Sequence, residues 1–304
     1  MSTHPAFIIT GPTSGFGLQT AFELAKHGTL VLVGRDAKKL DDVKTKLEAK
    51  GHQAIRIVCD LSDLASVRRA AEEIITLRLP IAGLVNNAGI REEKPTKSAQ
   101  GFDNSYATNH LGPFVFTELL APHLPDGATV TFVCSAVEDP ERKPARMAGF
   151  RGARYLSAEA CARGEWKPGG SEKPGMDSYA TTKQCNLATT MAFSRELPRL
   201  KFIAVEPGFS PVTGLSRDAS AVQRVVAGAL LSVLRPLIKH ATTPALAAKL
   251  ITNAVLNTEK RTGIYLDEKG SPMQGSVQVS DPKFQDLVVA ETRAFLSANQ
   301  GAQR

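Results

Sequence analysis

The chain alternates short, wholly apolar runs with longer segments in which apolar residues recur at helical spacing. The apolar runs have the length of strands and are bounded by glycine, proline or charged residues, whereas the intervening segments have the length of helices. A strand that is apolar throughout is buried on both faces, which is typical of a parallel sheet covered by helices on each side. The pattern therefore predicts a doubly wound α/β fold, in one domain over residues 1–304.

Ligands of such folds bind beyond the carboxyl ends of the strands, so the residues that follow each strand are the first candidates for a site. The expected strands are AFIIT, TLVLV, AIRIV, IAGLVNN, ATVTFV and KFIAVEP. The expected helices cover residues 15–27, 37–50, 63–78 and 101–121, and a later helix carries Tyr179.

The first strand is followed by TGPTSGFG, in which Gly11, Gly15 and Gly17 have the spacing G-x-x-x-G-x-G. Glycines let the backbone approach a pyrophosphate, and the next helix offers its amino terminus to negative charge. A plain tight turn is the alternative. The place of the glycine motif after the first strand of a parallel sheet favours a dinucleotide site of the Rossmann type.

The second strand ends in VLVGRD, which places Arg35 near the strand end. An arginine there accommodates the 2′-phosphate of NADP, whereas a carboxylate would hold the adenosine ribose of NAD. Arg35 therefore favours NADP(H), with a solvated loop residue as the alternative. Asp36 is expected to cap the helix that begins AKKL.

The next two strands also end in polar or small residues. In CDLSD, Asp60 is placed to accept a hydrogen bond from the adenine amino group, although Asp60 or Ser62 could instead cap the next helix. The sequence NNAG, from Asn86 to Gly89, is a turn of small residues against which an adenosine ribose could pack, or a plain turn.

Tyr179 and Lys183 lie four positions apart in MDSYATTKQCN, so both side chains point from one face of a helix. A free phenol has a pKa of about 10 and is a poor proton donor or acceptor near neutrality. A neighbouring ammonium would lower that pKa and make Tyr179 a general acid or base. An exposed pair without chemistry is the alternative for this motif taken alone.

Taken together, these motifs give a specific resemblance. With T-G-x-x-x-G-x-G, N-N-A-G, an asparagine in the following helix, a serine after the fifth strand and Y-x-x-x-K in that order, nearly the whole chain resembles the short-chain dehydrogenase/reductase family. The segments NHLGPF, YATTKQCN and PGFSPVTGL, and the ending GIYLDEKG…DPKFQDLVVAETRAFL, are most similar to the retinol-dehydrogenase and protochlorophyllide-reductase type.

The resemblance implies an NADP(H)-dependent enzyme that transfers hydride between the nicotinamide and a carbonyl or secondary alcohol. It makes Tyr179 the acid/base and gives Lys183 two roles, lowering the phenol pKa and binding the nicotinamide ribose. Ser135 would bond to the substrate oxygen, and Asn109 would hold a water of the proton relay. The implied cofactor-binding residues are Gly11, Thr13, Ser14, Gly15, Phe16, Gly17, Arg35, Asp60, Leu61, Asn86, Asn87, Ala88, Gly89, Tyr179, Lys183, Pro207, Gly208 and Thr213.

Two other functions stay open at this point. Reduction of a carbon–carbon double bond is one, because protochlorophyllide reductase is among the similar proteins. A cofactor-binding sensor without turnover is the other, although the complete set of Asn109, Ser135, Tyr179 and Lys183 argues against it.

The chain departs from the family pattern in two segments. Residues 136–176 form a long insertion beside Ser135, which we expect to cover the substrate or, alternatively, to contact another subunit. Its aromatic residues Phe150, Tyr155 and Trp166 would then line an apolar pocket. Residues 210–262 match the family's substrate lid, and one apolar face within them could also rest on a membrane surface. Both segments suggest a fairly large apolar substrate.

The composition of the chain argues against several kinds of partner and site, but it does not indicate a function. The net charge of +7 is spread along the 304 residues without an aromatic-interleaved basic stripe, so we expect no nucleic-acid partner. Four cysteines without a C-x-x-C pair indicate neither a zinc site nor a disulfide framework, and Cys134 is expected to pack as a small apolar side chain. We expect a cytoplasmic protein without signal peptide or integral membrane segment. A homo-oligomer is possible.

Overall fold

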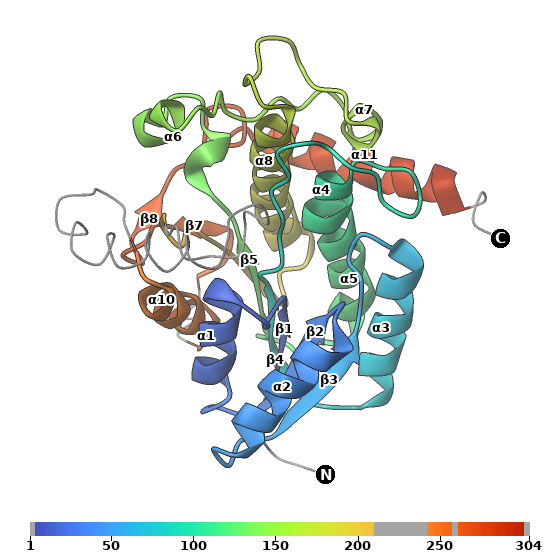
Figure 1. Cartoon of the computed structure of the whole chain (residues 1–304), viewed down its shortest axis with the longest axis vertical. Coiled ribbons are helices and arrows are strands. Elements are labelled where there is room, and N and C mark those ends of the chain that lie inside the picture. Colours follow the sequence, from blue (N-terminus) through green and yellow to red (C-terminus); the bar gives the residue numbers. More distant parts are fainter. Residues whose placement is uncertain (1–3, 210–241, 257–260, 301–304) are drawn as a thin grey trace.

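The computed structural model describes residues 4–209, 242–256 and 261–300. Strands from this part of the chain form one eight-stranded sheet in the order β3-β2-β1-β4-β5-β6-β7-β8 (Figure 1). Neighbouring strands are parallel except β7 and β8, which are antiparallel. The chain runs outward from β1 to β3 and then returns to β4 on the other side of β1, so the predicted doubly wound Rossmann fold is confirmed.

The structure gives the following bounds. The strands are β1 Ala6–Thr10, β2 Thr29–Gly34, β3 Ala54–Val58, β4 Ile81–Asn86, β5 Thr129–Val133, β6 Lys201–Val205, β7 Ile264–Leu266 and β8 Pro272–Met273. The α-helices are α1 Gly15–Leu24, α2 Ala37–Glu48, α3 Leu64–Thr76, α4 Asn104–Tyr106, α5 Gly112–Leu120, α6 Lys143–Met147, α7 Ala158–Arg163, α8 Pro174–Glu196, α10 Pro244–Leu256 and α11 Pro282–Gln300. A π-helix (Ala107–Leu111) and 3-10 helices (Ala121–His123, Ala136–Glu138) complete them.

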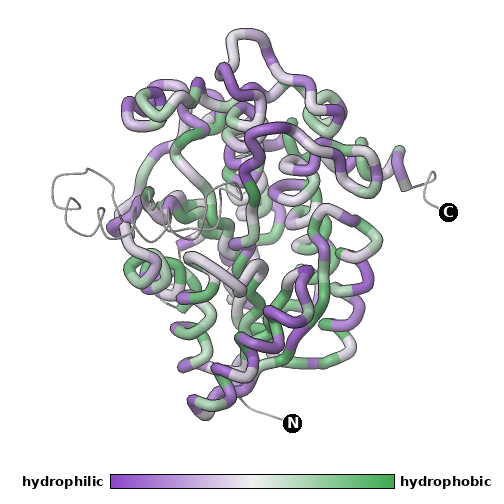
Figure 2. The backbone as a smooth tube through the Cα atoms, in the orientation of Figure 1, coloured by the Kyte–Doolittle hydropathy of each residue, from purple (hydrophilic) through white to green (hydrophobic). Residues whose placement is uncertain are grey.

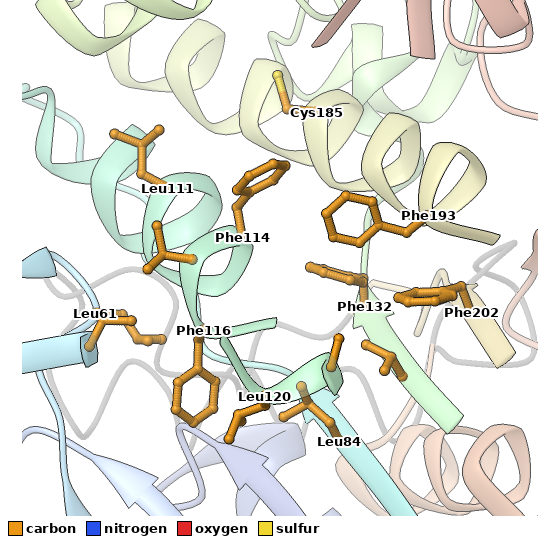
Figure 3. Packing of buried hydrophobic residues seen from close by; sticks show 14 of the residues in the cluster. Leu61, Leu84, Leu111, Phe114, Phe116, Leu120, Phe132, Cys185, Phe193 and Phe202 are labelled. Atoms are coloured by element: carbon orange, nitrogen blue, oxygen red, sulfur yellow. The ribbon is translucent and has the colours of Figure 1, made fainter. Parts of the chain in front are cut away.

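Helices cover both faces of the sheet. Apolar side chains of α1, α2 and α10 pack on one face, and those of α3, α5 and α8 pack on the other, with α11 lying against α8. Phenylalanines dominate the second core, where α5 and α8 meet β5 and β6 (Figure 3). In Figure 2, hydrophobic residues are most frequent along the central strands and on the inner sides of the helices, and hydrophilic residues are most frequent on the outside. Burial of both faces explains the continuous apolar strands.

The six predicted strands are all present, and the first three predicted helices appear as α1, α2 and α3. β7 and β8 were not predicted, because strands of three and two residues are too short to show a hydrophobic pattern.

The predicted continuous helix over 101–121 is wrong. Regular α-helix is interrupted between α4 and α5 by the π-helix, in which the N–H of Gly112 bonds to the carbonyl of Ala107. Pro113 follows and has no N–H to give to the carbonyl of Asn109, four residues back. The side-chain amide of Asn186 on α8 supplies that hydrogen bond instead, at 2.8 Å.

The insertion over 136–176 is folded onto the rest of the chain. It contains the 3-10 helix after Ser135, then α6 and α7, and it returns at the start of α8. Of the expected lid region 210–262, the structure describes α10 and the residues next to it, whereas 210–241 and 257–260 lie outside the described residues. Within the described ranges, every helix is too short or too polar to cross a bilayer.

Candidate active site

The glycine-rich loop joins β1 to α1 at the carboxyl edge of the sheet. Gly11 has a φ of +67°, a conformation that favours glycine. Gly17 lies so close to this loop that a Cβ on it would be 2.2 Å from the carbonyl oxygen of Gly11. Ser14 precedes α1 without a side-chain cap bond, and the first turn of α1 holds no acidic residue. The helix amino terminus is therefore free of an internal anion.

The NNAG turn is tied to this loop. The Thr10 hydroxyl accepts hydrogen bonds from the N–H groups of Asn87 and Ala88, both at 3.0 Å. The Asn87 amide donates to the carbonyl of Thr10 at 2.9 Å. Asn86 points to the other side and donates to the Thr117 hydroxyl at 2.9 Å. Asn87 and Ala88 at the end of β4 are thus bonded to the loop after β1, whereas Asn86 is not.

Arg35 is exposed directly after β2. The expected cap is confirmed, since the Asp36 carboxylate accepts from the N–H of Lys39 at 3.1 Å and begins α2. The alternative role of Asp60 or Ser62 as the cap of α3 is not found. Asp63 caps that helix, accepting from the N–H of Ala65 at 3.0 Å, while Asp60 accepts from the N–H and hydroxyl of Ser62. Each aspartate bonds to donors two residues ahead, but only Asp63 directly precedes the helix.

The four residues predicted to be catalytic are brought together between β4, β5 and α8. A Cβ built on Gly89 would be 3.5 Å from Asn109 Oδ1 and 3.6 Å from Lys183 Nζ. The Asn109 amide bonds to both the N–H and the carbonyl of Ile90, at 2.8 Å each, and this fixes its orientation. Ser135 follows β5, and its hydroxyl is near enough to the Tyr179 phenol to lower the phenol pKa.

Tyr179 is 7% exposed. Burial raises the pKa of its phenol well above the ordinary value, and the negative charge of Glu206 raises it further. The positive charge of Arg91 and the hydrogen bond with Ser135 act in the opposite direction but do not outweigh burial. The phenol is therefore protonated at neutral pH.

The expected lowering of the Tyr179 pKa by Lys183 is not what the structure shows. Lys183 is 3% exposed, and its Nζ donates to the carbonyl of Val133 at 2.7 Å. The Nζ lies 5.4 Å from the centre of the Tyr179 ring. Burial lowers the pKa of the lysine itself, with the Cys134 and Glu206 side chains opposing that shift. Exclusion of water disfavours both charged forms and explains why the simple ion-pair expectation fails.

The insertion contributes one apolar wall beside the phenol. Phe150 and Ala145 pack with Tyr179 and Ala180, and the Phe150 and Tyr179 ring centres are 6.3 Å apart. Tyr155 and Trp166 lie elsewhere. Tyr155 packs on Phe284 of α11, and the Trp166 ring contacts Tyr106 of α4. Of the three aromatic residues expected to line one pocket, only Phe150 contacts Tyr179.

Two charged residues at this edge were not predicted. Arg91 follows the NNAG turn, and Glu206 follows β6 with 8% exposure, beside Pro207 and Gly208. A carboxylate directly after an apolar strand is a usable sequence signal for Glu206. The family motif does not include this residue, because it consists of Pro207 and Gly208. Thr213, the expected nicotinamide contact, lies outside the described residues.

Several known proteins are similar to this chain. A family profile described as short chain dehydrogenase matches residues 5–144. A short-chain dehydrogenase/reductase of Armillaria gallica is 32% identical over 72% of this chain and 69% of its own length. Retinol dehydrogenase 12 of Bos taurus is 36% identical over 41% of each chain, as the sequence resemblance suggested.

The fold is also found in solved structures. A short chain dehydrogenase from Burkholderia cenocepacia, solved in complex with NADP, has a TM-score of 0.62 and 21% identity, covering 86% of this chain and 95% of its own. That identity speaks for the fold alone, whereas the Armillaria relative carries the family assignment. The chain therefore belongs to the short-chain dehydrogenase/reductase family of nicotinamide-dependent oxidoreductases.

Proposed function

We propose that this protein is an NADP(H)-dependent reductase of carbonyl groups on a fairly large apolar substrate, with Tyr179 as the proton donor. One observation carries the proposal: Tyr179, Ser135, Lys183 and Asn109 converge at the edge of the sheet where the NNAG turn and the glycine-rich loop also meet. The reverse reaction, oxidation of a secondary alcohol, uses the same groups in the opposite direction.

The described residues fit a dinucleotide. The glycine cradle at Gly11 and Gly17 would be filled by any Cβ, and the free amino terminus of α1 suits a pyrophosphate. Arg35 would hold the 2′-phosphate, and this supports NADP(H) over NAD(H). Pro207 and Gly208 would face the nicotinamide, and Lys183 would hold its ribose. The bound cofactor supplies the hydride; the chain supplies orientation and the proton.

The proton chemistry follows from burial. A phenol whose pKa is raised is protonated at neutral pH and can donate to an alkoxide that develops on the substrate. The Ser135 hydroxyl, which lies near that phenol, would stabilise the same oxygen. Asn109 is held rigidly by Ile90 and would order a water behind Lys183.

An apolar substrate is supported by the surroundings of Tyr179. The ring is walled by Phe150, Ala145 and Met176 from the insertion and the start of α8. Phe209, just beyond the Pro207–Gly208 turn, is 61% exposed and offers a further apolar contact. Such walls favour a substrate whose reacting carbonyl is attached to hydrocarbon.

Replacing Tyr179 by phenylalanine tests the proposal. The variant keeps the ring packing but loses the proton, so we expect turnover to fall about 100-fold or more. A panel of apolar aldehydes and ketones with NADPH would identify the working substrate, and NADPH oxidation would measure the rate. Binding of NADPH, followed by the cofactor's own fluorescence, should change less than about threefold because the phosphate-binding residues are untouched.

Tyr106→Phe is the matched control. Tyr106 is fully buried but packs against His110 and Trp166, so its replacement should leave the rate unchanged. Full turnover in the Tyr179 variant would contradict the assignment of the acid. Product analysis by mass spectrometry and NMR separates an alcohol product from a saturated carbon–carbon bond, and a wild-type protein that binds NADPH but reduces nothing would support a sensor.

A further inference from the structure

Glu206 is a buried carboxylate with an unusual set of partners. It follows β6, and its own N–H is fixed by the carbonyl of Leu266 on β7, at 2.7 Å. One carboxylate oxygen accepts from the backbone N–H of Ala136, and the other accepts from the N–H of Gly208 at 3.0 Å. The Tyr265 hydroxyl lies 3.5 Å from the first oxygen.

The two backbone donors belong to different loops. β5 and β6 are neighbours, with Val133 opposite Val205, so the loops that leave them start side by side. Ala136 is bonded covalently to Ser135 in the first loop. Gly208 has a φ of +85° and turns the second loop away from the sheet. The Glu206 side chain therefore joins the loop of the predicted catalytic serine to the loop expected to face the nicotinamide.

We propose that Glu206 is a positioning residue that ties these two loops together and keeps the Ser135 hydroxyl aligned with the Tyr179 phenol. The inference rests on the proposed function for its catalytic consequence, whereas the tie itself is a property of the fold. A backbone N–H held by a buried carboxylate cannot swing without leaving that carboxylate unsatisfied, so the residue before Ala136 is held as well.

The same carboxylate acts on the titration of its neighbours. It faces Tyr179 and Lys183 from α8, Cys134 after β5, Tyr265 and Glu268 from the β7 side, and Arg142 from the insertion. Burial raises the pKa of Glu206, and the two N–H donors and Arg142 oppose that shift. Both oxygens already accept backbone N–H groups, an arrangement that suits the ionised, acceptor-only form.

The charge of Glu206 affects the pH dependence of kcat through the pKa of Tyr179. A negative charge beside a phenol makes the phenolate less favourable, so Glu206 raises the pKa of Tyr179. Glu206→Gln removes that charge and lowers the phenol pKa. In carbonyl reduction, the protonated phenol is then lost at a lower pH, and the alkaline limb of the kcat profile moves to lower pH.

The test compares Glu206→Gln and Glu206→Ala with Glu138→Gln as the matched control. Glu138 is a second buried carboxylate in the insertion, but it accepts from the N–H and hydroxyl of Ser276 at 2.8 and 2.6 Å rather than from the two loops. Hydrogen exchange, followed by mass spectrometry without substrate, reports the amides of Ala136 and Gly208. Steady-state rates use NADPH and the best aldehyde found for the wild type.

We expect Glu206→Ala to exchange both amides at least about tenfold faster, and Glu206→Gln to do so for at least one of them, because the single glutamine oxygen can replace only one of the two acceptors. We expect kcat to fall about 10- to 100-fold, since small misplacements of catalytic groups have effects of that size, with NADPH affinity changed less than about threefold. Both Glu206 variants should move the alkaline limb to lower pH, because each removes the negative charge beside the phenol. Glu138→Gln should leave the exchange of both amides and the pH limb unchanged.

Wild-type exchange at Ala136 and Gly208 in Glu206→Gln would overturn the inference, as would a rate loss without any shift of the pH limb. Glu206→Gln is the nearest isostere and decides the matter if the alanine variant does not fold. If the wild type reduces no carbonyl compound, the proposed function fails, while the exchange experiment still shows whether the two loops are tied.

Discussion

Tyr179, Lys183 and Glu206 share a region from which water is largely excluded. Burial pushes each of them toward its neutral form: the pKa of the phenol and of the carboxyl rises, and that of the ammonium falls. In such surroundings, one neighbouring charge or one hydrogen bond decides the protonation state. The pKa of Tyr179 therefore depends on the charged and polar side chains around it.

Arg35 gives a prediction at the same scale, outside the buried region. In Arg35→Ala, the NADPH dissociation constant should rise about 10- to 100-fold, because a charged hydrogen bond contributes roughly 1.5–3 kcal/mol. The NADH constant should stay within about twofold, since NADH has no 2′-phosphate. Fluorescence titration of both cofactors measures the two constants.

Lys44→Ala is the control for this change. Lys44 lies on α2, where its Nζ is 3.5 Å from Glu48, and it carries the same charge away from the strand end. Equal weakening of NADPH and NADH by the Arg35 change would contradict the cofactor assignment.

Single residues were predictable from the sequence where their role is local. Asp36 caps α2 as expected, because the cap depends on the three residues that follow it. The pKa of Tyr179 was not predictable, since it is controlled by burial and by Glu206, which reaches it only through the pairing of β5 with β6. Such neighbours depend on packing that no four-residue motif contains.

Among the elements, the π-helix between α4 and α5 has a clear physical cause. Pro113 leaves the carbonyl of Asn109 without its helical donor, and Asn186 of α8 provides one. The Asn186 side-chain oxygen lies 3.2 Å from a ring nitrogen of His110, whose other nitrogen lies 3.1 Å from the Thr292 hydroxyl of α11. Burial lowers the pKa of His110 to about 4, so this network is uncharged at neutral pH.

Asn186→Ala should destabilise the protein by about 3 kcal/mol. It leaves the Asn109 carbonyl and a His110 nitrogen buried without partners, and each such group costs roughly 1–3 kcal/mol. Urea unfolding followed by circular dichroism measures the change. Asn299→Ala removes a comparable amide, which donates to the carbonyl of Phe295 at 2.8 Å on the half-exposed side of α11, and should cost less than about 1 kcal/mol. Similar losses in both variants would argue against a special role for the π-helix.

Hydrophobic periodicity was sufficient to predict the alternation of strands and helices. Strands that are buried on two faces are apolar throughout, and the helices that cover them are apolar on one face. It could not predict the break at Ala107–Leu111, which requires a partner on another helix 77 residues further along the chain. Nor could it separate α6 and α7 within the insertion, since helices of 5 and 6 residues are too short to show a helical period.

Across the whole molecule, the insertion is held by the last helix. One carboxylate oxygen of Glu291 on α11 accepts from the Tyr155 hydroxyl at 2.7 Å and from the N–H of Ala158, at the start of α7, at 3.0 Å. Phe284 of α11 packs edge-on against the Tyr155 ring. α11 thus covers α8 and anchors the insertion at the same time (Figure 1).

Glu291→Ala should loosen this anchor. It leaves the Tyr155 hydroxyl buried without its acceptor, so we expect a loss of roughly 1–3 kcal/mol in unfolding free energy and faster hydrogen exchange over residues 153–165. Asp286 lies on the same helix as Glu291, and Asp286→Asn breaks its exposed ion pair with Arg195 of α8. This change should cost less than about 1 kcal/mol and leave that exchange unchanged. Unaltered exchange over 153–165 in the Glu291 variant would show that other contacts hold the insertion.

The anchor also dictates an order of events during synthesis. Tyr155 and Glu291 are 136 residues apart. During synthesis the insertion therefore leaves the ribosome before the part of α11 that carries Glu291 has been translated. Contacts between such distant partners form late. Strands β1 to β5 and the glycine-rich loop are translated before the insertion, which can gain its contacts with α11 only after residues 282–300 are made.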